Sequence, residues 1–140
     1  MDKKNDALLC ETFPLLYADR AADMRGTCMC WGFSCGDGWF QLIWDLSEKL
    51  EPMIAAIDGS DDERPKASQV KEKFGTLRFY MTSSTDEMES AIGEAEARSA
   101  VTCEHCGRPG VLRSEDRYWV LTLCDLCDAE DRAKKGLRDG

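Results

Sequence analysis

The stretch Cys103-Glu-His-Cys106-Gly107, followed after sixteen residues by Cys124-Asp-Leu-Cys127, decides the fold of the C-terminal part of this chain. Two residues between paired cysteines let a tight turn aim both sulfur atoms at one metal ion, and the glycine permits the backbone conformation of such a turn. Thiolates are soft ligands that suit a closed tetrahedral zinc site. We therefore expect Cys103, Cys106, Cys124 and Cys127 to bind one structural zinc ion.

The residues around the two pairs predict how this site is built. Two strand-like runs, 111–113 and 118–123, flank the polar residues 114–117, and the residues after Cys127 predict a helix that is acidic first and basic last. Knuckle, hairpin, second pair and helix in this order resemble a treble-clef zinc finger, with a zinc ribbon as the alternative. His105 lies inside the first knuckle, but four cysteines already complete the shell, so we do not expect it to be a ligand.

The strongest helical signal lies at residues 38–50, where apolar side chains recur at helical spacing. Asp37 is the expected N-cap and Pro52 the expected break, after which a second short helix is predicted. Residues 6–22 predict a first helix that Pro14 interrupts, and residues 24–38 are expected to be irregular because glycines punctuate them.

Residues 69–81 predict a β-hairpin, because apolar and polar side chains alternate in two runs around Gly75-Thr76, the expected two-residue turn. One predicted face is apolar except at Glu72. The other face carries a basic and aromatic stripe on a protein that is otherwise acidic, and we predict that this stripe contacts a partner. Its residues are Lys71, Lys73, Arg78 and Tyr80.

The hairpin is followed by a helix and then by the cysteines. Ser84 and Glu87 have capping-box spacing and predict a helix to about Ser99. Only three residues then precede Cys103, so the zinc module should pack on the rest of the chain. We expect an α+β fold, with helices around a small antiparallel hairpin in residues 1–100 and a treble-clef or zinc-ribbon module in residues 101–140.

Four further cysteines raise the question of a second metal site. Cys28, Cys30 and Cys35 lie within eight residues of one another, and Cys10 would be a fourth ligand, but the spacing matches no common site. The alternative, which we prefer, is that these cysteines are small, buried and reduced side chains.

Composition and charge limit the partners and the cellular compartment that we expect for this protein. Its 140 residues are 43% hydrophobic and carry a formal net charge of −9. Such a surface repels phosphate backbones, so direct nucleic-acid binding is disfavoured and a basic partner is favoured. We find no apolar run long enough to span a membrane and no secretory signal, and we expect a protein of the reducing cytoplasm.

The sequence offers no catalytic constellation. Nucleases of the His-Asn-His type need several histidines, whereas this chain has one. Zinc deaminases need an open zinc position and a Pro-Cys-x-x-Cys motif that the chain lacks. A cysteine hydrolase needs a separate cysteine–histidine pair, and a redox Cys-x-x-Cys needs a thioredoxin-like context. We therefore expect that this protein is not an enzyme.

Three motifs stand out along the chain: Cys35-Gly-Asp-Gly-Trp39, Gln69-Val-Lys-Glu-Lys-Phe-Gly-Thr-Leu-Arg-Phe-Tyr80, and 95–99 leading into Cys103-Glu-His-Cys-Gly107. Together they resemble a group of small, uncharacterised proteins encoded by bacteriophages and prophages. The resemblance covers about residues 28–128, and the middle motif is its most specific part. It implies a phage setting and a C-terminal four-cysteine zinc finger, but no activity.

These observations lead to three hypotheses about function. The first is a non-catalytic zinc-binding protein-interaction factor of phage origin, which binds a host or phage protein and inhibits a host defence such as CRISPR or a nucleic-acid-processing complex. The second is a nucleic-acid-associated zinc protein that uses Lys71, Lys73 and Arg78. The third is an unrecognised enzyme. Binding of nucleic acid that weakens steeply with salt would favour the second.

Overall fold

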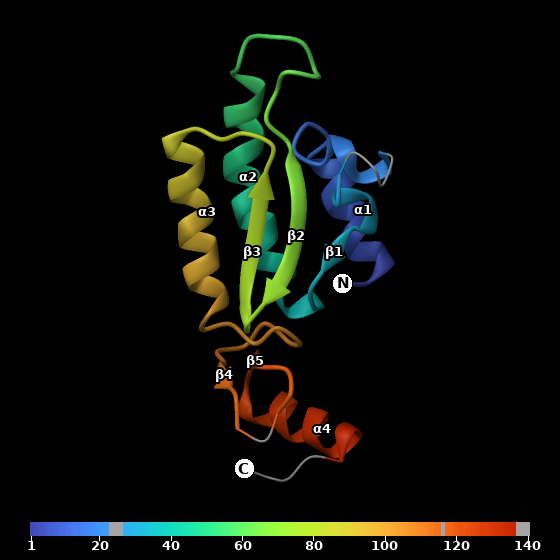
Figure 1. Cartoon of the computed structure of the whole chain (residues 1–140), viewed down its shortest axis with the longest axis vertical. Helices are drawn as coiled ribbons and strands as arrows, with labels where there is room; N and C mark the ends of the chain where they lie inside the picture. The colour runs from blue at the N-terminus through green and yellow to red at the C-terminus, as the bar shows by residue number, and fades with distance from the viewer. Residues whose placement is uncertain (23–26, 116, 137–140) are drawn as a thin grey trace.

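A computed structural model describes residues 1–22, 27–115 and 117–136. The predicted α+β class is confirmed: helices surround a three-stranded sheet, and a smaller unit with a two-stranded sheet follows at the C-terminal end (Figure 1). Among the described residues, no helix combines the length and apolar character needed to cross a membrane. The elements are α1 (Lys3–Thr12), β1 (Phe33–Ser34), α2 (Phe40–Ala55), β2 (Ala67–Lys73), β3 (Thr76–Met81), α3 (Asp86–Ser99), β4 (Val111–Arg113), β5 (Leu121–Leu123) and α4 (Asp125–Lys135).

The three-stranded sheet is built around the predicted hairpin. β2 and β3 pair antiparallel, and the last pair, Lys73 with Thr76, leaves Phe74-Gly75 as the two-residue turn. The predicted turn, Gly75-Thr76, is therefore wrong by one residue. β1 adds a third strand, parallel to β2, inside the stretch expected to be irregular; residues 24–26 of that stretch lie outside the described residues.

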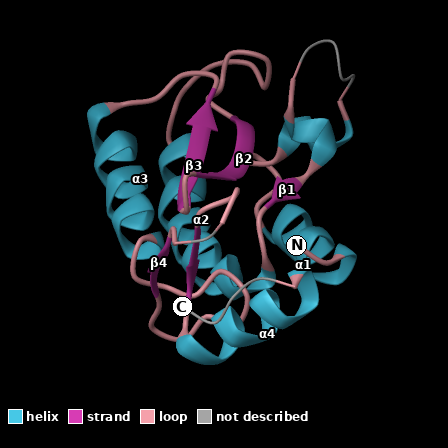
Figure 2. Ribbon diagram, turned by 60° about the horizontal axis from the view of Figure 1, so that its bottom comes forward, coloured by secondary structure: helices cyan, strands magenta, loops and turns pink. Residues whose placement is uncertain are grey.

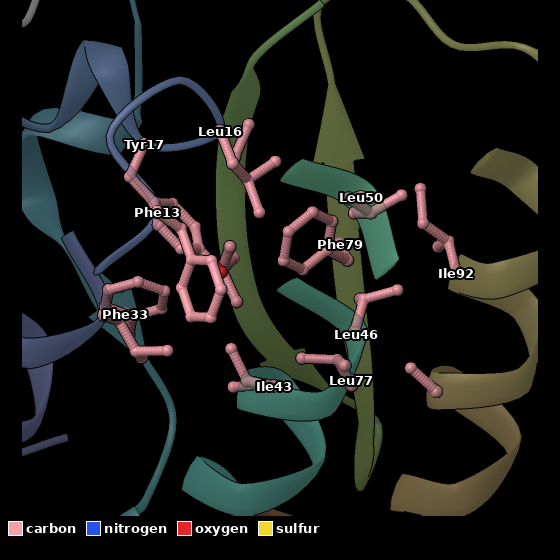
Figure 3. Close-up of a cluster of buried hydrophobic side chains, with 14 of the residues drawn as sticks. Phe13, Leu16, Tyr17, Phe33, Ile43, Leu46, Leu50, Leu77, Phe79 and Ile92 are labelled. Atoms are coloured by element: carbon pink, nitrogen blue, oxygen red, sulfur yellow. The ribbon is translucent and has the colours of Figure 1, made fainter. Parts of the chain in front are cut away.

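The main core lies between the hairpin and the helices. α3 packs along β3 and against α2 (Figure 2). Apolar side chains of the hairpin, such as Leu77 and Phe79, meet Leu46 and Leu50 of α2 (Figure 3). The buried hydroxyls of Tyr17 and Ser47 bond each other at 2.7 Å, so this polar pair is satisfied inside the core.

The first helix is shorter than predicted. α1 begins at Lys3, where Asp2 accepts a hydrogen bond from the backbone N–H of Asn5 at 2.8 Å, and it ends at Thr12 rather than running to residue 22. Pro14 explains this end, because the residue before a proline is disfavoured in the helical region. A short 3-10 helix, Ala18–Ala21, then lies where the rest of the predicted helix was expected.

The predicted helix at residues 38–50 is found, but its start and end differ. A 3-10 turn, Asp37–Trp39, leads into α2, and Trp39 occupies the cap position without a side-chain bond. Asp37 is not the N-cap of α2: its carboxylate accepts from Asp2 N at 2.9 Å and from Asn5 Nδ2 at 3.1 Å. The helix also continues through Pro52 to Ala55, so the two predicted helices are one.

α3 begins one residue later than its predicted capping box requires. Thr85, not Ser84, is the N-cap, and its hydroxyl accepts from the backbone N–H of Met88 at 3.2 Å. The face predicted to lie on the hairpin is buried, from Met88 to Ser99. The buried Ser99 hydroxyl accepts the backbone N–H of Leu77 at 2.9 Å, which ties the end of α3 to β3.

The C-terminal unit consists of the β4–β5 hairpin and α4, beyond the turn between β2 and β3 (Figure 1). β5 is shorter than the run predicted at 118–123; Asp116, in the predicted polar connection, lies outside the described residues. α4 begins at Asp125, before the predicted start after Cys127, and ends at Lys135, where Gly136 forms the C-cap in the left-handed conformation.

Candidate metal centre

The first cysteine pair lies in a tight loop that its own backbone closes. Cys103 N donates to Arg108 O at 2.7 Å, and Gly107 N donates to Cys103 O at 2.9 Å. Gly107 has a φ of 83°, a conformation that only glycine adopts without strain. The loop therefore presents the sulfurs of Cys103 and Cys106 on the same side, as the spacing predicts.

The second pair lies at the start of α4. Cys124 is the N-cap of this helix, and its sulfur accepts the backbone N–H of Cys127 at 3.4 Å. This hydrogen bond, together with those from the other three thiols, lowers the pKa of the Cys124 thiol to about 7, which favours the thiolate that a metal ion requires. β5, which leads directly into Cys124, carries buried side chains at all three of its positions.

The structure brings the four predicted cysteines together. The four sulfur atoms all lie within 4.8 Å of one another, and those of Cys106 and Cys124 are 3.6 Å apart. A tetrahedron of metal–sulfur bonds of about 2.3 Å places its sulfurs about 3.8 Å apart, so this group fits a single tetrahedral metal ion. His105 is exposed and is not a member of the group.

A buried ionic cluster that the motifs did not reveal fixes the loop between β4 and β5. The side chain of Arg117 is 1% exposed, and its guanidinium pairs with Asp128 and Asp131 of α4. Arg113 adds a bond of 2.7 Å to Asp125. Burial works against the charged form of Asp128, but the hydrogen bonds from Arg117 and Arg132 lower the pKa of its carboxyl. The loop is thus anchored on the helix that carries the second cysteine pair.

The Gly36–Trp39 motif lies directly against the first knuckle. Gly38 N donates to Glu104 O at 2.8 Å, and the indole N–H of Trp39 donates to Thr102 O at 2.9 Å. Gly36 N donates to the carboxylate of Glu104 at 3.0 Å. These three bonds join the main core to the metal-binding unit, which gives the motif a structural role that capping alone did not predict.

Glu104 is the buried acid at this junction. Burial raises the pKa of its carboxyl to about 7, although the bond from Gly36 favours the charged form. Its second oxygen, Oε1, has no hydrogen-bond partner among the described residues. Nothing in the sequence distinguished this residue except its place between two cysteines.

The other cysteines do not form a comparable group. Among the described residues, the only set of three or more potential ligands close enough for a metal ion is the four-cysteine cluster. The Cys10 thiol lies 3.6 Å from Asp6, and the Cys30 thiol donates to Thr27 O at 3.4 Å. Burial raises the pKa of Cys10 and Cys35 to about 12, so both are protonated thiols at neutral pH, whereas Cys28 is exposed.

The residues predicted to contact a partner lie on one face of the β2–β3 hairpin. Lys71 pairs with Arg78 in the register, and residues two positions further along a strand share its face. Lys71 Nζ lies 5.8 Å from the centre of the Tyr80 ring, and Lys73 Nζ lies 5.5 Å from that of Phe74. Tyr80 and Lys73 are exposed, so the stripe is an accessible surface.

No protein-family model, no curated protein and no solved structure matches this chain.

Proposed function

We propose that this protein is a non-catalytic protein-interaction factor, and that a structural zinc ion bound by Cys103, Cys106, Cys124 and Cys127 holds the C-terminal unit in place. Four thiolates at tetrahedral spacing favour zinc over harder cations. A complete four-cysteine shell leaves no open position for a substrate or a catalytic water. The metal supplies folding free energy, and the surface that it supports makes the contacts.

We propose that the zinc unit is a treble clef rather than a zinc ribbon. A knuckle supplies the first pair, a β-hairpin follows, and the second pair lies in the first turn of a helix. The position of Cys124 as the N-cap of α4 supports this choice, because a helix that begins at the second pair is the distinguishing element of a treble clef.

The basic and aromatic face of the hairpin is the observation that carries the interaction proposal. Lys71, Lys73, Arg78 and Tyr80 gather on one accessible face of a chain whose net charge is −9. Tyrosine and arginine are enriched among residues that dominate the binding energy of protein interfaces. A local charge opposite to that of the whole molecule selects a partner and orients it.

The resemblance to phage and prophage proteins supplies the proposed setting. In that setting the partner is a host or phage protein in the cytoplasm, and its binding inhibits a host defence or a nucleic-acid-processing complex. Direct binding of nucleic acid is the alternative, because lysines beside aromatic rings also occur on surfaces that bind single strands. The net charge of the chain favours the protein partner.

The test is affinity purification of the tagged protein from bacterial cells, with a matched pair of variants. Lys71→Glu with Arg78→Glu reverses two charges on the hairpin face, and Lys4→Glu with Lys134→Glu changes the net charge equally on α1 and α4. We expect the wild-type protein and the α1/α4 variant to retain the same protein, and the hairpin variant to lose it. If both variants retain it, the hairpin face is not the binding surface. If nuclease-sensitive nucleic acid is recovered instead, the alternative holds.

A further inference from the structure

A hollow of about 650 Å³ lies between the end of the β2–β3 hairpin and the loop that connects β4 to β5. It joins the predicted contact face to the metal-binding unit, and the motifs of the sequence did not point to it. Its walls are formed mainly by Lys71, Lys73, Phe74, Tyr118, Trp119 and Val120.

Three aromatic side chains at this hollow are exposed to solvent. Tyr118 is fully exposed, Phe74 is 69% exposed and Trp119 is 64% exposed. Exposed aromatic side chains contribute little to folding, but they supply large contact areas to a partner at a low cost in conformational entropy. Their concentration at one place, beside a cavity, is typical of a binding site rather than of a solvated surface.

Hydrogen bonds connect the two walls of the hollow to each other. The indole N–H of Trp119 donates to Glu72 Oε1 at 2.5 Å, and the Thr122 hydroxyl donates to Gly75 O at 2.6 Å. The buried Arg117, which directly precedes Tyr118 in the chain, also holds the loop onto α4. A site whose walls are already ordered loses less entropy on binding.

The walls of the hollow have a net positive charge, because they carry two lysines and one carboxylate. The Lys73 ammonium group lies over the Phe74 ring in the wall, and the Lys71 ammonium group lies over the neighbouring Tyr80 ring. The one carboxylate in its wall, Glu72, is engaged by the Trp119 indole and by Gly75 N at 3.3 Å. The hollow therefore complements a ligand with apolar side chains and a small number of negative charges.

We propose that this hollow binds a short acidic segment of a partner protein, in which a large apolar side chain is flanked by Asp or Glu. The apolar side chain fills the space between Phe74 and Trp119, and the carboxylates pair with Lys71 and Lys73. This inference rests on the proposed interaction function and names the chemistry of the partner. A polyphosphate chain fits less well, because beyond the two lysines it would meet the acidic surface of a chain with net charge −9.

The test is a selection from a randomised peptide library displayed on yeast, with the zinc-loaded protein as bait. The same selection is performed in parallel on Tyr118→Ala with Lys73→Glu. Tyr118 is fully exposed and Lys73 is exposed, so neither change removes a buried contact. We expect the wild-type protein alone to enrich peptides that place Phe, Leu or Trp beside two or more acidic residues.

Affinities of an enriched peptide then separate the outcomes. We expect Lys73→Glu to weaken binding about tenfold or more and added salt to weaken it further, whereas Lys4→Glu should leave it unchanged. Enrichment of the same peptides by the variant, or of peptides without acidic residues, would overturn the proposal. Tighter binding of oligothymidylate than of any peptide, with the same dependence on Lys73, would assign the hollow to a single strand instead.

This experiment can fail independently of the proposed function. If a cellular protein is retained through Lys71 and Arg78 but no acidic peptide is selected, the interaction function stands and the hollow is not its peptide site. If peptides are selected but no cellular protein is retained through the hairpin face, the site stands and the proposed function fails.

Discussion

At the scale of single residues, Gly36 and Gly38 matter for the space that they leave empty. A Cβ atom at Gly38 would lie 2.2 Å from Cys103 O, and one at Gly36 would lie 2.4 Å from Glu104 O. Both distances are far below van der Waals contact with backbone atoms, which cannot rotate away. The glycines of this motif are therefore required by the close approach of two chain segments, and neither has a positive φ.

Replacement of Gly38 by alanine should destabilise the protein by roughly 2–4 kcal/mol, since the methyl group forces the knuckle away from the main core. Gly93 is the matched control, because it lies in α3 where an added Cβ atom would meet no atom of another element within 4 Å. Gly93→Ala should stabilise by about 0.5–1 kcal/mol. Urea unfolding of both variants measures the difference, and equal midpoints for Gly38→Ala and wild type would contradict the assignment.

Among the cysteines, Cys106 should be needed for metal binding and Cys28 should not. Cys106→Ser removes one of four clustered sulfurs, so we expect the zinc content of the purified protein to fall well below that of the wild type. Cys28→Ser should keep it, because Cys28 is exposed and lies outside the cluster. Elemental analysis by mass spectrometry gives both ratios. Wild-type zinc content in Cys106→Ser would remove that residue from the ligand set.

At the scale of elements, the turn between β2 and β3 holds a phenylalanine in an unfavourable conformation. Phe74 has a φ of 55° and Gly75 a φ of 84°, and a positive φ at both positions is the pattern of a type I′ turn. Asn-Gly is the usual sequence of such a turn, whereas other L-residues incur a cost of about 1–2 kcal/mol. The chain tolerates this strain at the residue whose ring lines the hollow.

Phe74→Asn should therefore raise the free energy of unfolding by about 1 kcal/mol, as asparagine adopts a positive φ more readily. Phe74→Leu is the control, because leucine has the same backbone restriction and should bring no gain. Thermal unfolding of the zinc-loaded proteins compares the two. The same Asn variant should bind an acidic peptide more weakly, and stability that rises equally in both variants would argue against backbone strain.

The elements that the sequence predicted well are those determined by local periodicity. The apolar spacing of α2 and α3 and the alternation in β2 and β3 are local signals, and all four elements are present. β1 could not be predicted in this way, because it has two residues and exists only through parallel pairing with a strand more than thirty positions later. The predictions of helix ends failed where tertiary contacts outweighed a local rule. Asp37, for example, accepts hydrogen bonds from the start of α1 instead of capping α2.

The same division applies to the candidate site. The gathering of the four cysteines follows from their spacing, since each pair is local and the two pairs together match the ligand pattern of a single metal site. The ionic cluster of Arg117 has no fixed spacing that marks it in the sequence, although its partners lie only 11 and 14 positions away. The contact of Gly38 with Glu104 joins residues far apart in the chain. The hollow beside Trp119 arises from the placement of one unit on the other, which no motif encodes.

At the scale of the whole molecule, two clusters of buried side chains differ greatly in size. The main core extends from α1 to α3, whereas in the C-terminal unit it consists of Leu121 and Leu123 with two of the ligand cysteines. So small a cluster cannot offset the conformational entropy of the segment. Metal binding, worth about 10–16 kcal/mol in zinc-finger peptides at pH 7, is the term that can.

Removal of zinc by a strong chelator should therefore unfold residues 103–135 and leave the main core folded. Limited proteolysis followed by mass spectrometry should then show cleavage sites within residues 103–135. It should also show a protected fragment that ends near residue 100. Restored zinc should restore resistance, whereas magnesium should not, because thiolates bind hard cations poorly. Equal cleavage rates with and without chelator would show that the metal does not hold this unit.

The junction between Gly36–Trp39 and the knuckle also limits which C-terminal units could replace the present one during evolution. Donors in the first segment meet acceptors that lie 63 to 68 positions later, with no side chain that could adjust on the glycine side. A gene that acquired its C-terminal unit from another protein would lose the Glu104 carboxylate that accepts from Gly36 N, and a differently shaped knuckle would not bring carbonyl groups within reach of Gly38 N and the Trp39 indole. The Gly36–Trp39 motif and the knuckle that contains Glu104 should therefore be gained, lost and altered together among descendants of this gene.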